Sequence, residues 1–259
     1  MRHQQQRPAA QLIYGLHPLE EALSSGASIE KIWMKKGLTG LLVKELTKQA
    51  HDAGVPVTFV PSEKLNRMTS KNHQGVIAAL SPIRYVSTDD IVQSALSKGE
   101  FPLIVVCDKV TDVRNVGAIA RTALGTGAHG LVTPQYETAL ITDDAVKASA
   151  GALLKLPVSR EQSLERCVDF LKLNGIVTVA ADAKGKTFSY EQDFNQPVAI
   201  VMGSEDEGVS ENVLKKMDAV VKLPMTPNAE SYNVSVAAGM LLYEAMRQRT
   251  ENEKLKTKN

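Results

Sequence analysis

The chain has 259 residues, of which 43% are hydrophobic, enough apolar material for one large core or two ordinary ones. It has no run of about 18 apolar residues and only two cysteines, so we expect a cytoplasmic protein with reduced thiols, no membrane span and no disulfide framework. The net charge of +1 conceals an asymmetry, because residues 1–84 hold 11 Lys and Arg against 6 Asp and Glu, whereas residues 85–259 hold 19 against 23.

The first third of the chain alternates short β-rich runs with helical runs. Ser62 is a candidate cap for the last of these helices. The alternation predicts a compact α/β domain over residues 1–82, and its basic charge favours contact with nucleic acid, although a solvated charged surface explains the charge equally well. The predicted strands are 12–15, 31–35, 55–60 and 75–80, and the predicted helices are 18–24, 41–53 and 62–68.

Residues 83–101 are rich in Pro, Ser and Gly, and we predict a linker there with one short helix at 89–97. Residues 102–250 restart the alternation, which predicts a second α/β domain with a mostly parallel sheet covered on both faces. Residues 251–259 are a charged tail that we expect to fray. The predicted strands are 103–107, 130–133, 176–181, 198–202 and 219–223, and the predicted helices are 115–124, 143–151, 162–173, 211–217 and 233–249.

Gly125, Gly127 and Gly130 have the spacing of a dinucleotide-binding loop. That motif works only when a strand precedes it and a helix follows, because the phosphates then lie at the helix N-terminus. Here a helix precedes the glycines and a strand follows. The glycines therefore indicate the end of a helix rather than a nicotinamide or flavin site.

The first of three informative loops follows the strand predicted at 103–107, at the edge of the sheet where α/β proteins bind ligands. Asn115 is well placed to cap the next helix. Arg121 lies opposite the apolar stripe of that helix, and Gly117, one turn earlier, leaves space beside it. On this evidence alone, the pattern favours a solvated surface arginine.

The second loop, at 203–208, follows a strand of the fully buried type and is acidic between two glycines. Gly203 permits a ligand to approach the backbone closely. Glu205 is able to accept hydrogen bonds or a proton. Adjacent carboxylates point in different directions and no second ligand cluster is evident, so we expect no metal site.

The third loop, at 223–235, joins a predicted strand to the final helix and contains two prolines. Ser231 and Asn233 are helix caps by default. Each of the three loops is ordinary alone. Three loops that leave strands of one sheet at the same edge predict a shared binding site.

These loops, in this order, resemble the three motifs of the SpoU-type, TrmH-like RNA 2′-O-methyltransferases of the SPOUT class. The N-terminal stretches 13–23 and 72–76 look like the substrate-binding domain of the bacterial ribosomal RNA members. The resemblance covers nearly the whole chain and is strongest to enzymes that methylate a guanosine 2′-hydroxyl in 23S ribosomal RNA. The stretches that match the three motifs are 115–121, 202–208, and 223–225 with 231–237.

The resemblance implies a trefoil-knot methyltransferase domain, in which the C-terminal chain passes through a loop, behind a smaller N-terminal RNA-binding domain. It also implies a homodimer with the final helix at the interface. S-adenosyl-L-methionine would be bound by Gly203, Leu223, Met225, Ser231 and Tyr232. The last of these replaces a usual leucine, and its ring is able to stack on adenine.

By the same resemblance Arg121 is the catalytic arginine, and Asn115, Glu205 and Asn233 shape the site around it. Val113 replaces a usual proline. A ribose hydroxyl is a poor nucleophile until its proton leaves. Because a guanidinium normally stays protonated, we expect Arg121 to hold the flanking phosphate and the developing alkoxide, with Glu205 as a rival proton acceptor.

We expect RNA selection to belong mainly to the N-terminal domain, although the stretch 72–75 reads equally well as a simple turn. The alternatives to a ribosomal RNA enzyme are a transfer-RNA 2′-O-methyltransferase and a non-catalytic RNA-binding or ribosome-assembly protein. The stretch 72–75 argues against the first, and the intact set of four catalytic residues argues against the second. The expected RNA contacts are Lys35, Lys36, Arg67, Asn72, His73, Gln74 and Arg114.

Overall fold

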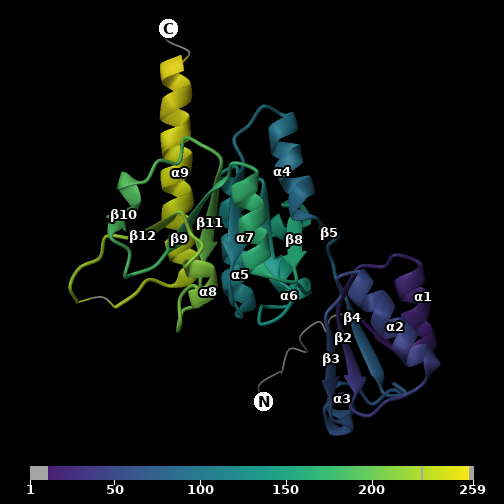
Figure 1. The fold of residues 1–259 in the computed structure, drawn as a ribbon. Helices are drawn as coiled ribbons and strands as arrows, with labels where there is room; N and C mark the ends of the chain where they lie inside the picture. Colours follow the sequence, from purple (N-terminus) through teal and green to yellow (C-terminus); the bar gives the residue numbers. More distant parts are fainter. Residues whose placement is uncertain (1–10, 229, 257–259) are drawn as a thin grey trace. The chain divides into compact units, whose positions relative to one another are not determined.

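The computed structural model describes residues 11–228 and 230–256. The chain divides into two compact units, of which the first is mostly purple to blue in Figure 1 and the second runs from blue at α4 to yellow at α9. The first unit contains the chain up to Arg84 together with Leu140–Asp144. The second contains Tyr85–Ala139 and the chain from Ala145 onward.

The first unit is a mixed sheet with helices on both faces. Its strands follow the order β1-β4-β2-β3, in which β2 and β3 are parallel and the other neighbours are antiparallel. Leu46 of α2 is buried on one face and Leu65 of α3 on the other. Ser62 is not the cap of α3, because Pro61 occupies that position. The elements are β1 (Leu12–Tyr14), α1 (Leu16–Ser24), β2 (Ile29–Lys35), α2 (Leu41–Asp52), β3 (Val57–Val60), α3 (Ser62–Met68) and β4 (Val76–Leu80).

A short segment from the second half of the chain completes the first unit. The backbone N–H of Ile141 donates a hydrogen bond of 2.8 Å to Oε1 of Glu30, and both residues are buried. A buried carboxylate needs such donors to offset its desolvation. This return of the chain was not predicted, because it depends on a contact between residues far apart in the sequence.

The second unit is built on one parallel sheet, which confirms the predicted α/β class. The strand order is β10-β12-β9-β11-β6-β7-β8-β5. β5, β8 and β10 were not predicted. The elements are β5 (Tyr85–Val86), α4 (Thr88–Ser97), β6 (Leu103–Cys107), α5 (Val113–Gly125), β7 (Gly130–Pro134), α6 (Asp143–Ala148), η1 (Ala152–Leu154), β8 (Val158–Glu161), α7 (Leu164–Leu173), β9 (Val177–Ala181), β10 (Thr187–Phe188), η2 (Ser189–Glu191), β11 (Val198–Met202), α8 (Glu211–Leu214), β12 (Ala219–Lys222) and α9 (Val234–Lys256).

Helices cover this sheet because its central strands are apolar along their whole length. Side chains of α4, α7 and α8 share one core cluster with β6, β7, β9 and β11. Helices α5 and α9 pack against each other, and α9 also contacts β11 (Figure 1). Gly125 ends α5 and Gly130 begins β7, so the glycine-rich stretch lies between a helix and a strand, as predicted.

The stretch 83–101, expected to be a linker, contributes structure to the second unit. Strand β5 pairs with β8, and α4 buries Ile91 and Val92 against the sheet. Helix α4 begins with a capping box, in which Ser87 Oγ accepts from the N–H of Asp90 and the Asp90 carboxylate accepts from the N–H of Ser87. The short helix predicted at 89–97 is confirmed as α4, and it packs into the core of the second unit.

Helix α9 continues to Lys256, so its predicted end at Arg249 is wrong. Residues 257–259 of the predicted tail lie outside the described residues. No described helix, α9 included, combines the length and apolar character that a bilayer crossing requires. The guanidinium of Arg249 fastens this part of the helix by donating to the backbone oxygens of Phe101, Pro102, Phe194 and Gln196.

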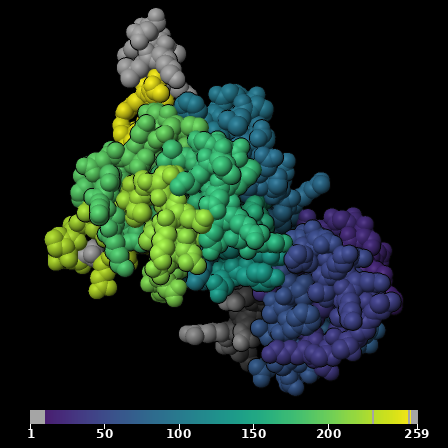
Figure 2. All heavy atoms as spheres, in the orientation of Figure 1, coloured from purple at the N-terminus to yellow at the C-terminus, as the bar shows by residue number. Residues whose placement is uncertain are grey.

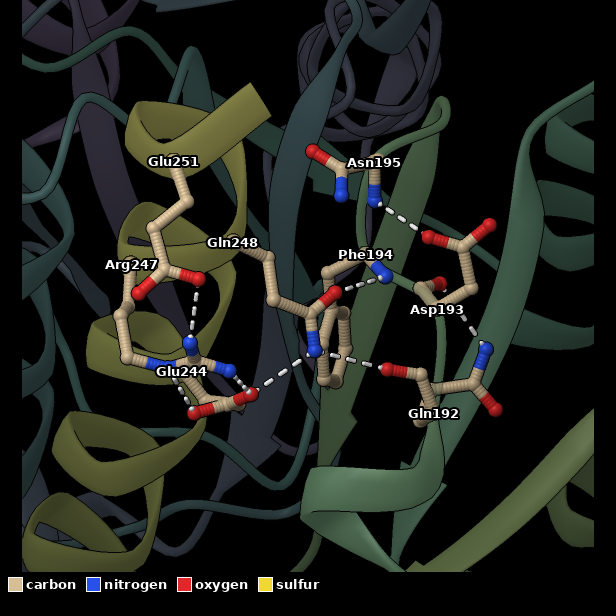
Figure 3. A network of polar contacts seen from close by, with 8 residues as sticks. All are labelled: Gln192, Asp193, Phe194, Asn195, Glu244, Arg247, Gln248 and Glu251. Atoms are coloured by element: carbon tan, nitrogen blue, oxygen red, sulfur yellow. Dashed lines mark hydrogen bonds and ion pairs between the residues drawn. The ribbon is translucent and has the colours of Figure 1, made fainter. Parts of the chain in front are cut away.

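A side-chain amide on α9 holds the segment that precedes β11 (Figure 3). Oε1 of Gln248 accepts from the N–H of Phe194 at 2.8 Å, and its Nε2 donates to the carbonyl of Gln192 at 3.0 Å. The same Nε2 donates to Glu244, which is paired with Arg247. The Gln248 amide thus bonds one backbone N–H and one backbone carbonyl of the segment before β11. This pair of bonds fixes the register of α9 against that segment.

Both cysteines are free and buried, in agreement with the expected reduced thiols. Burial raises the pKa of Cys107 to about 12, and it raises the pKa of Cys167 to about 12 as well. The thiolate is the reactive form of cysteine. The two side chains therefore act as small core residues rather than as nucleophiles.

Candidate functional site

A cavity of about 280 Å³ lies at the carboxyl ends of β9, β11 and β12. It is bordered by the segments that follow these three strands and by the first turn of α9. Figure 2 draws the segments after β11 and β12, in green to yellow-green, at the surface of the second unit. The residues predicted to hold a cofactor all line this cavity: Gly203, Leu223, Met225, Ser231 and Tyr232.

The cavity combines apolar walls with an acidic mouth. Met202, Val221 and Leu223 supply apolar surface. Lys184 is the one basic side chain among its described lining residues, whereas carboxylates come from both the β9 and β11 loops. Such a lining favours a ligand with a flat apolar part and a positive charge. The acidic lining residues are Asp182, Glu205, Asp206 and Glu207.

Asp182 and Lys184 were missed by the sequence analysis. Both follow directly after β9, a strand that was predicted at nearly its observed bounds. The rule that ligands bind at the carboxyl ends of parallel strands would have identified this loop as a fourth contributor. The loop was passed over because it has no motif of its own.

The absence of a side chain at Gly203 permits the acidic loop to close on itself. A Cβ at this position would lie 1.9 Å from the carbonyl carbon of Gly208 and 2.1 Å from the nitrogen of Val209. Ser204 and Gly208 also exchange two backbone hydrogen bonds of 3.0 Å. The acidic loop is therefore closed on itself, and this closure places Glu205 at its tip.

Three predicted site residues from distant parts of the chain form a closed set of hydrogen bonds. Nδ2 of Asn115 donates to Oε1 of Glu205 at 2.9 Å. Nδ2 of Asn233 donates to Oδ1 of Asn115 at 3.0 Å and also to Oε1 of Glu205. The Oδ1 of Asn233 accepts from the N–H of Ser235 and caps α9. Oε2 of Glu205 makes no hydrogen bond within the described residues, so one carboxylate oxygen stays available.

Asn115 was predicted to cap α5, but the cap is Asp112. Oδ1 of Asp112 accepts from the N–H of Arg114 at 2.7 Å. Hydrogen bonds from the side chain and backbone of Arg114 lower the pKa of Asp112 to about 2. Arg114 itself is exposed and ion-paired to this carboxylate at 2.7 Å. Because Asp112 supplies the cap three residues before Asn115, the Asn115 amide is free to reach Glu205.

Gly117 permits close helix packing and does not leave open space beside Arg121, as the sequence analysis had predicted it would. A Cβ at Gly117 would lie 2.6 Å from the Cβ of Ala148 and 2.9 Å from the backbone nitrogen of Ser149. Ser149 is itself buried and donates to the carbonyl of Val146. The first turns of α5 therefore lie directly against the end of α6.

Arg121 stands apart from the other predicted catalytic residues. It is exposed on α5 and does not line the cavity. Within the described residues it forms no hydrogen bond or ion pair with Asn115, Glu205 or Asn233. The described residues of one chain therefore bring together three of the four predicted catalytic residues, and Arg121 is not among them.

Tyr232 braces the loop that connects β12 to α9. Its hydroxyl donates a hydrogen bond of 2.9 Å to the carbonyl of Pro224, at the other end of the loop. The ring borders the cavity. A leucine at this position would lack that donor, so the tyrosine adds a contact that the resemblance did not imply.

The predicted RNA-contacting side chains of the first unit differ in whether they are exposed or hydrogen-bonded within the protein. The N–H of Gly75 donates to Nδ1 of His73 at 3.0 Å, so Nε2 of His73 donates to Asn66 at 2.9 Å. Both ring nitrogens of His73 are therefore engaged inside the loop at 72–75. The exposed members of the set are Lys35, Lys36, Arg67, Asn72 and Gln74.

Two family models match the chain. Residues 102–243 match the SpoU rRNA Methylase family, and residues 12–86 match the model described as RNA 2′-O ribose methyltransferase substrate binding. The first match spans the strands and loops that border the cavity. The second coincides with the basic first unit.

Curated relatives match over most of their length. A Bacillus subtilis (strain 168) protein, YacO, bears the name TrmH family tRNA/rRNA methyltransferase and is 36% identical over 237 residues, covering 92% of this chain and 95% of that protein. A Staphylococcus haemolyticus (strain JCSC1435) protein of the same description is 35% identical over 238 residues, covering 92% and 96%.

Solved structures share the fold. The SpoU methyltransferase AviRb from Streptomyces viridochromogenes, crystallised with the cofactor AdoMet, superposes with a TM-score of 0.60 at 26% identity, covering 93% of this chain and 91% of that one. The A. aeolicus TrmH/SpoU tRNA modifying enzyme superposes with a TM-score of 0.54 at 31% identity, covering 60% and 78%.

Because the acidic loop closes tightly at Gly203, we expect any side chain at this position to lower the stability of the fold strongly. We expect Gly203→Ala to lower the free energy of unfolding by at least about 2 kcal/mol, because the new Cβ meets backbone atoms that cannot move aside cheaply. Gly125→Ala is the control, since nothing lies within 4 Å of its added Cβ, and it should change stability by less than about 1 kcal/mol. Chemical denaturation of both variants measures this, and equal stabilities would contradict the packing account.

Proposed function

The chain belongs to the SpoU rRNA methylase family, and from this premise we propose that it uses the β9–β11–β12 cavity to methylate a ribose 2′-hydroxyl of RNA. It is an RNA methyltransferase that depends on S-adenosylmethionine, as in the related AviRb complex with that cofactor. The observation that carries the proposal is the hydrogen-bonded set of Asn115, Glu205 and Asn233, which joins the loops around the cavity.

The residues that border the cavity fit this cofactor. The apolar walls at Met202, Val221 and Leu223 suit an adenine ring. The carboxylates at the mouth outnumber the single lysine, which favours a molecule that carries a sulfonium and an ammonium group. We assign Gly203, Leu223, Met225, Ser231 and Tyr232 to cofactor binding, with Asp182 as an added contributor.

Bound cofactor supplies an electrophilic methyl group, so the protein's own task is to position and activate the hydroxyl. The Asn115 and Asn233 amides hold Oε1 of Glu205 and leave Oε2 unengaged, in a side chain that borders the cavity. Oε2 is then able to accept the 2′-hydroxyl proton as the methyl group is transferred. Arg121 holds the flanking phosphate and the developing alkoxide, the role that suits a group that stays protonated.

We propose a homodimer in which a second copy covers part of α9. Val236, Met240 and Tyr243 are exposed at spacings that place them on one face of the helix. Leu124, which lies about one helical turn after Arg121 on α5, is also exposed. A second copy on this apolar surface would bring a second Arg121 near the site and so account for its absence from the cavity of its own chain. The trefoil knot and a cytoplasmic location stay predictions.

The proposed substrate is a guanosine of 23S ribosomal RNA. The resemblance of the first unit to substrate-binding domains of ribosomal RNA enzymes supports this choice, together with the match of residues 12–86. Exposed lysines and Arg67 on that unit supply phosphate-binding charge. Transfer RNA is the alternative, because the curated relatives bear names that include both RNAs.

The substrate assignment is tested by methyl transfer to purified RNA. Labelled S-adenosylmethionine should transfer its methyl group to deproteinised 23S RNA taken from cells that lack the protein, and mapping should find one 2′-O-methylguanosine. Transfer to transfer RNA instead would replace the proposed substrate. Cofactor binding without transfer to either RNA would favour a non-catalytic RNA-binding protein.

The proposed role of Arg121 predicts a graded response to substitution. Arg121→Ala should lower kcat/KM by about 100-fold or more, whereas Arg121→Lys should keep part of the activity because it retains the positive charge. Cofactor affinity, measured by calorimetry, should change in neither variant, since Arg121 does not line the cavity. Equal and complete loss in both variants, with RNA affinity unchanged, would contradict an electrostatic role.

The same methyl-transfer assay distinguishes the proposed electrostatic role of Arg121 from the proposed proton-accepting role of Glu205. Glu205→Gln preserves the shape of the side chain and can keep one hydrogen bond from the amides, but it removes the charged proton acceptor. A Glu205→Gln enzyme that works at the full rate would exclude Glu205 from proton removal.

A further inference from the structure

A second cavity lies at the same edge of the parallel sheet, and the proposed function does not use it. Its volume is about 290 Å³, and it lies at the carboxyl ends of β6, β7 and β8, wholly within the second unit. We call it the β6–β8 cavity. Residues that border it include Asp108, Lys109, Gln135, Tyr136, Glu137 and Glu165.

Gln135 presents an unbonded side-chain amide to the β6–β8 cavity. The residue is only 8% exposed, and its backbone N–H donates to the carbonyl of Glu161 at 2.8 Å. Its side-chain amide makes no hydrogen bond within the described residues, yet the residue borders the β6–β8 cavity. Within the described residues no fully buried side-chain nitrogen or oxygen lacks a partner, so the unbonded amide of Gln135 is open to the cavity. It is therefore available to a ligand with a matching donor and acceptor.

Tyr136, the next residue, offers a flat surface at the rim. It is 49% exposed, and it borders the same cavity. An exposed aromatic ring beside a polar pocket is the arrangement that proteins use to stack a base taken out of an RNA strand. Gln135 and Tyr136 leave β7 together, so the hydrogen-bonding group and the stacking group come from one short segment.

The charge of the cavity selects among RNA groups. Asp108, Glu137 and Glu165 outnumber Lys109, the basic residue among its described lining. Hydrogen bonds from its own backbone N–H and from Ser163 lower the pKa of Glu165, so it stays ionised at neutral pH. A net negative lining repels a phosphate and attracts the exocyclic amino group of a base.

Lys109 connects this cavity to the cofactor loop. Its Nζ lies 3.6 Å from a carboxylate oxygen of Glu137, at the β6–β8 cavity, and 3.6 Å from one of Glu207, at the proposed cofactor cavity. One side chain therefore contacts the borders of both cavities. A nucleotide bound at the first would lie near a ribose bound at the second.

We propose that the β6–β8 cavity binds an amino-bearing base, namely adenine, cytosine or guanine, from a nucleotide close to the methylated ribose in the same RNA strand. Tyr136 stacks on the base, and the Gln135 amide pairs with its edge. The carboxylates of the lining accept from the amino group. This assignment rests on the proposed RNA methylation and adds to it a second point at which the enzyme reads its substrate.

Free nucleosides test the base cavity without any methyl transfer. The full chain is first saturated with S-adenosylmethionine, so that adenosine cannot occupy the proposed cofactor cavity. Adenosine, cytidine and uridine are then titrated and followed by saturation-transfer NMR. We expect weak binding of adenosine and cytidine and about fivefold weaker binding of uridine, which lacks the amino group.

Two variants and one control locate the binding. Tyr136→Ala and Gln135→Met should each weaken adenosine binding by about fivefold or more. Tyr190→Ala is the control, because Tyr190 is an exposed aromatic residue stacked on Phe188 and lies outside both cavities. Thermal unfolding and cofactor affinity establish that each variant is folded.

The outcomes separate this inference from the function on which it rests. No nucleoside binding, uridine binding as tight as adenosine binding, or adenosine binding unchanged in both variants would overturn the base cavity. Loss of methyl transfer to RNA in the unaltered protein, with nucleoside binding as expected, would overturn the proposed reaction and leave the cavity as a nucleoside site.

Discussion

The site depends on one closed set of hydrogen bonds between Asn115, Glu205 and Asn233. These residues come from α5, from the loop after β11 and from the start of α9, and more than a hundred residues of chain separate the first from the last. Glu205 and Asn233 are exposed, so we expect the set to add little to global stability. Its effect is positional, because it links three loops that otherwise share only the edge of a sheet, and it leaves one carboxylate oxygen of Glu205 unengaged.

Close backbone packing makes this set possible. Gly117 permits the first turns of α5 to lie against Ala148 and Ser149, and Gly203 permits the acidic loop to fold back on Gly208. Asp112 caps α5, which releases the Asn115 amide from that task. The polar geometry at the cavity therefore depends on close backbone packing beneath the hydrogen-bonded side chains. This arrangement is common in enzymes, where rigid elements position a few reactive groups.

Local sequence signals accounted for much of the fold and for part of the site. The bounds of β6 and β11 were predicted correctly, because each is a continuous apolar run that turn residues delimit. Strand β8 was missed because its sequence from Val158 to Glu161 has one apolar residue, and its pairing with β7 supplies the rest of its stability. The sequence-based cap of α5 was wrong because two good capping residues stand three positions apart, and only the structure shows which one binds the backbone.

Features that depend on contacts across the chain escaped prediction. The return of Leu140–Asp144 to the first unit rests on a hydrogen bond to Glu30, and the reason for Gly203 rests on a clash with Gly208. The Gln135 amide at the β6–β8 cavity has no motif at all. Arg121 belongs to a further class, because its proposed partner lies outside the single chain.

The central claim is that the loops after β9, β11 and β12 form the binding site of S-adenosylmethionine. A crystal structure of the protein grown with this cofactor tests the claim most directly. The account predicts the cofactor in contact with Gly203, Leu223 and Tyr232, and its methyl group on the side that faces Glu205. A cofactor bound elsewhere on the chain, or one bound here with its methyl group turned away from Glu205, would contradict it.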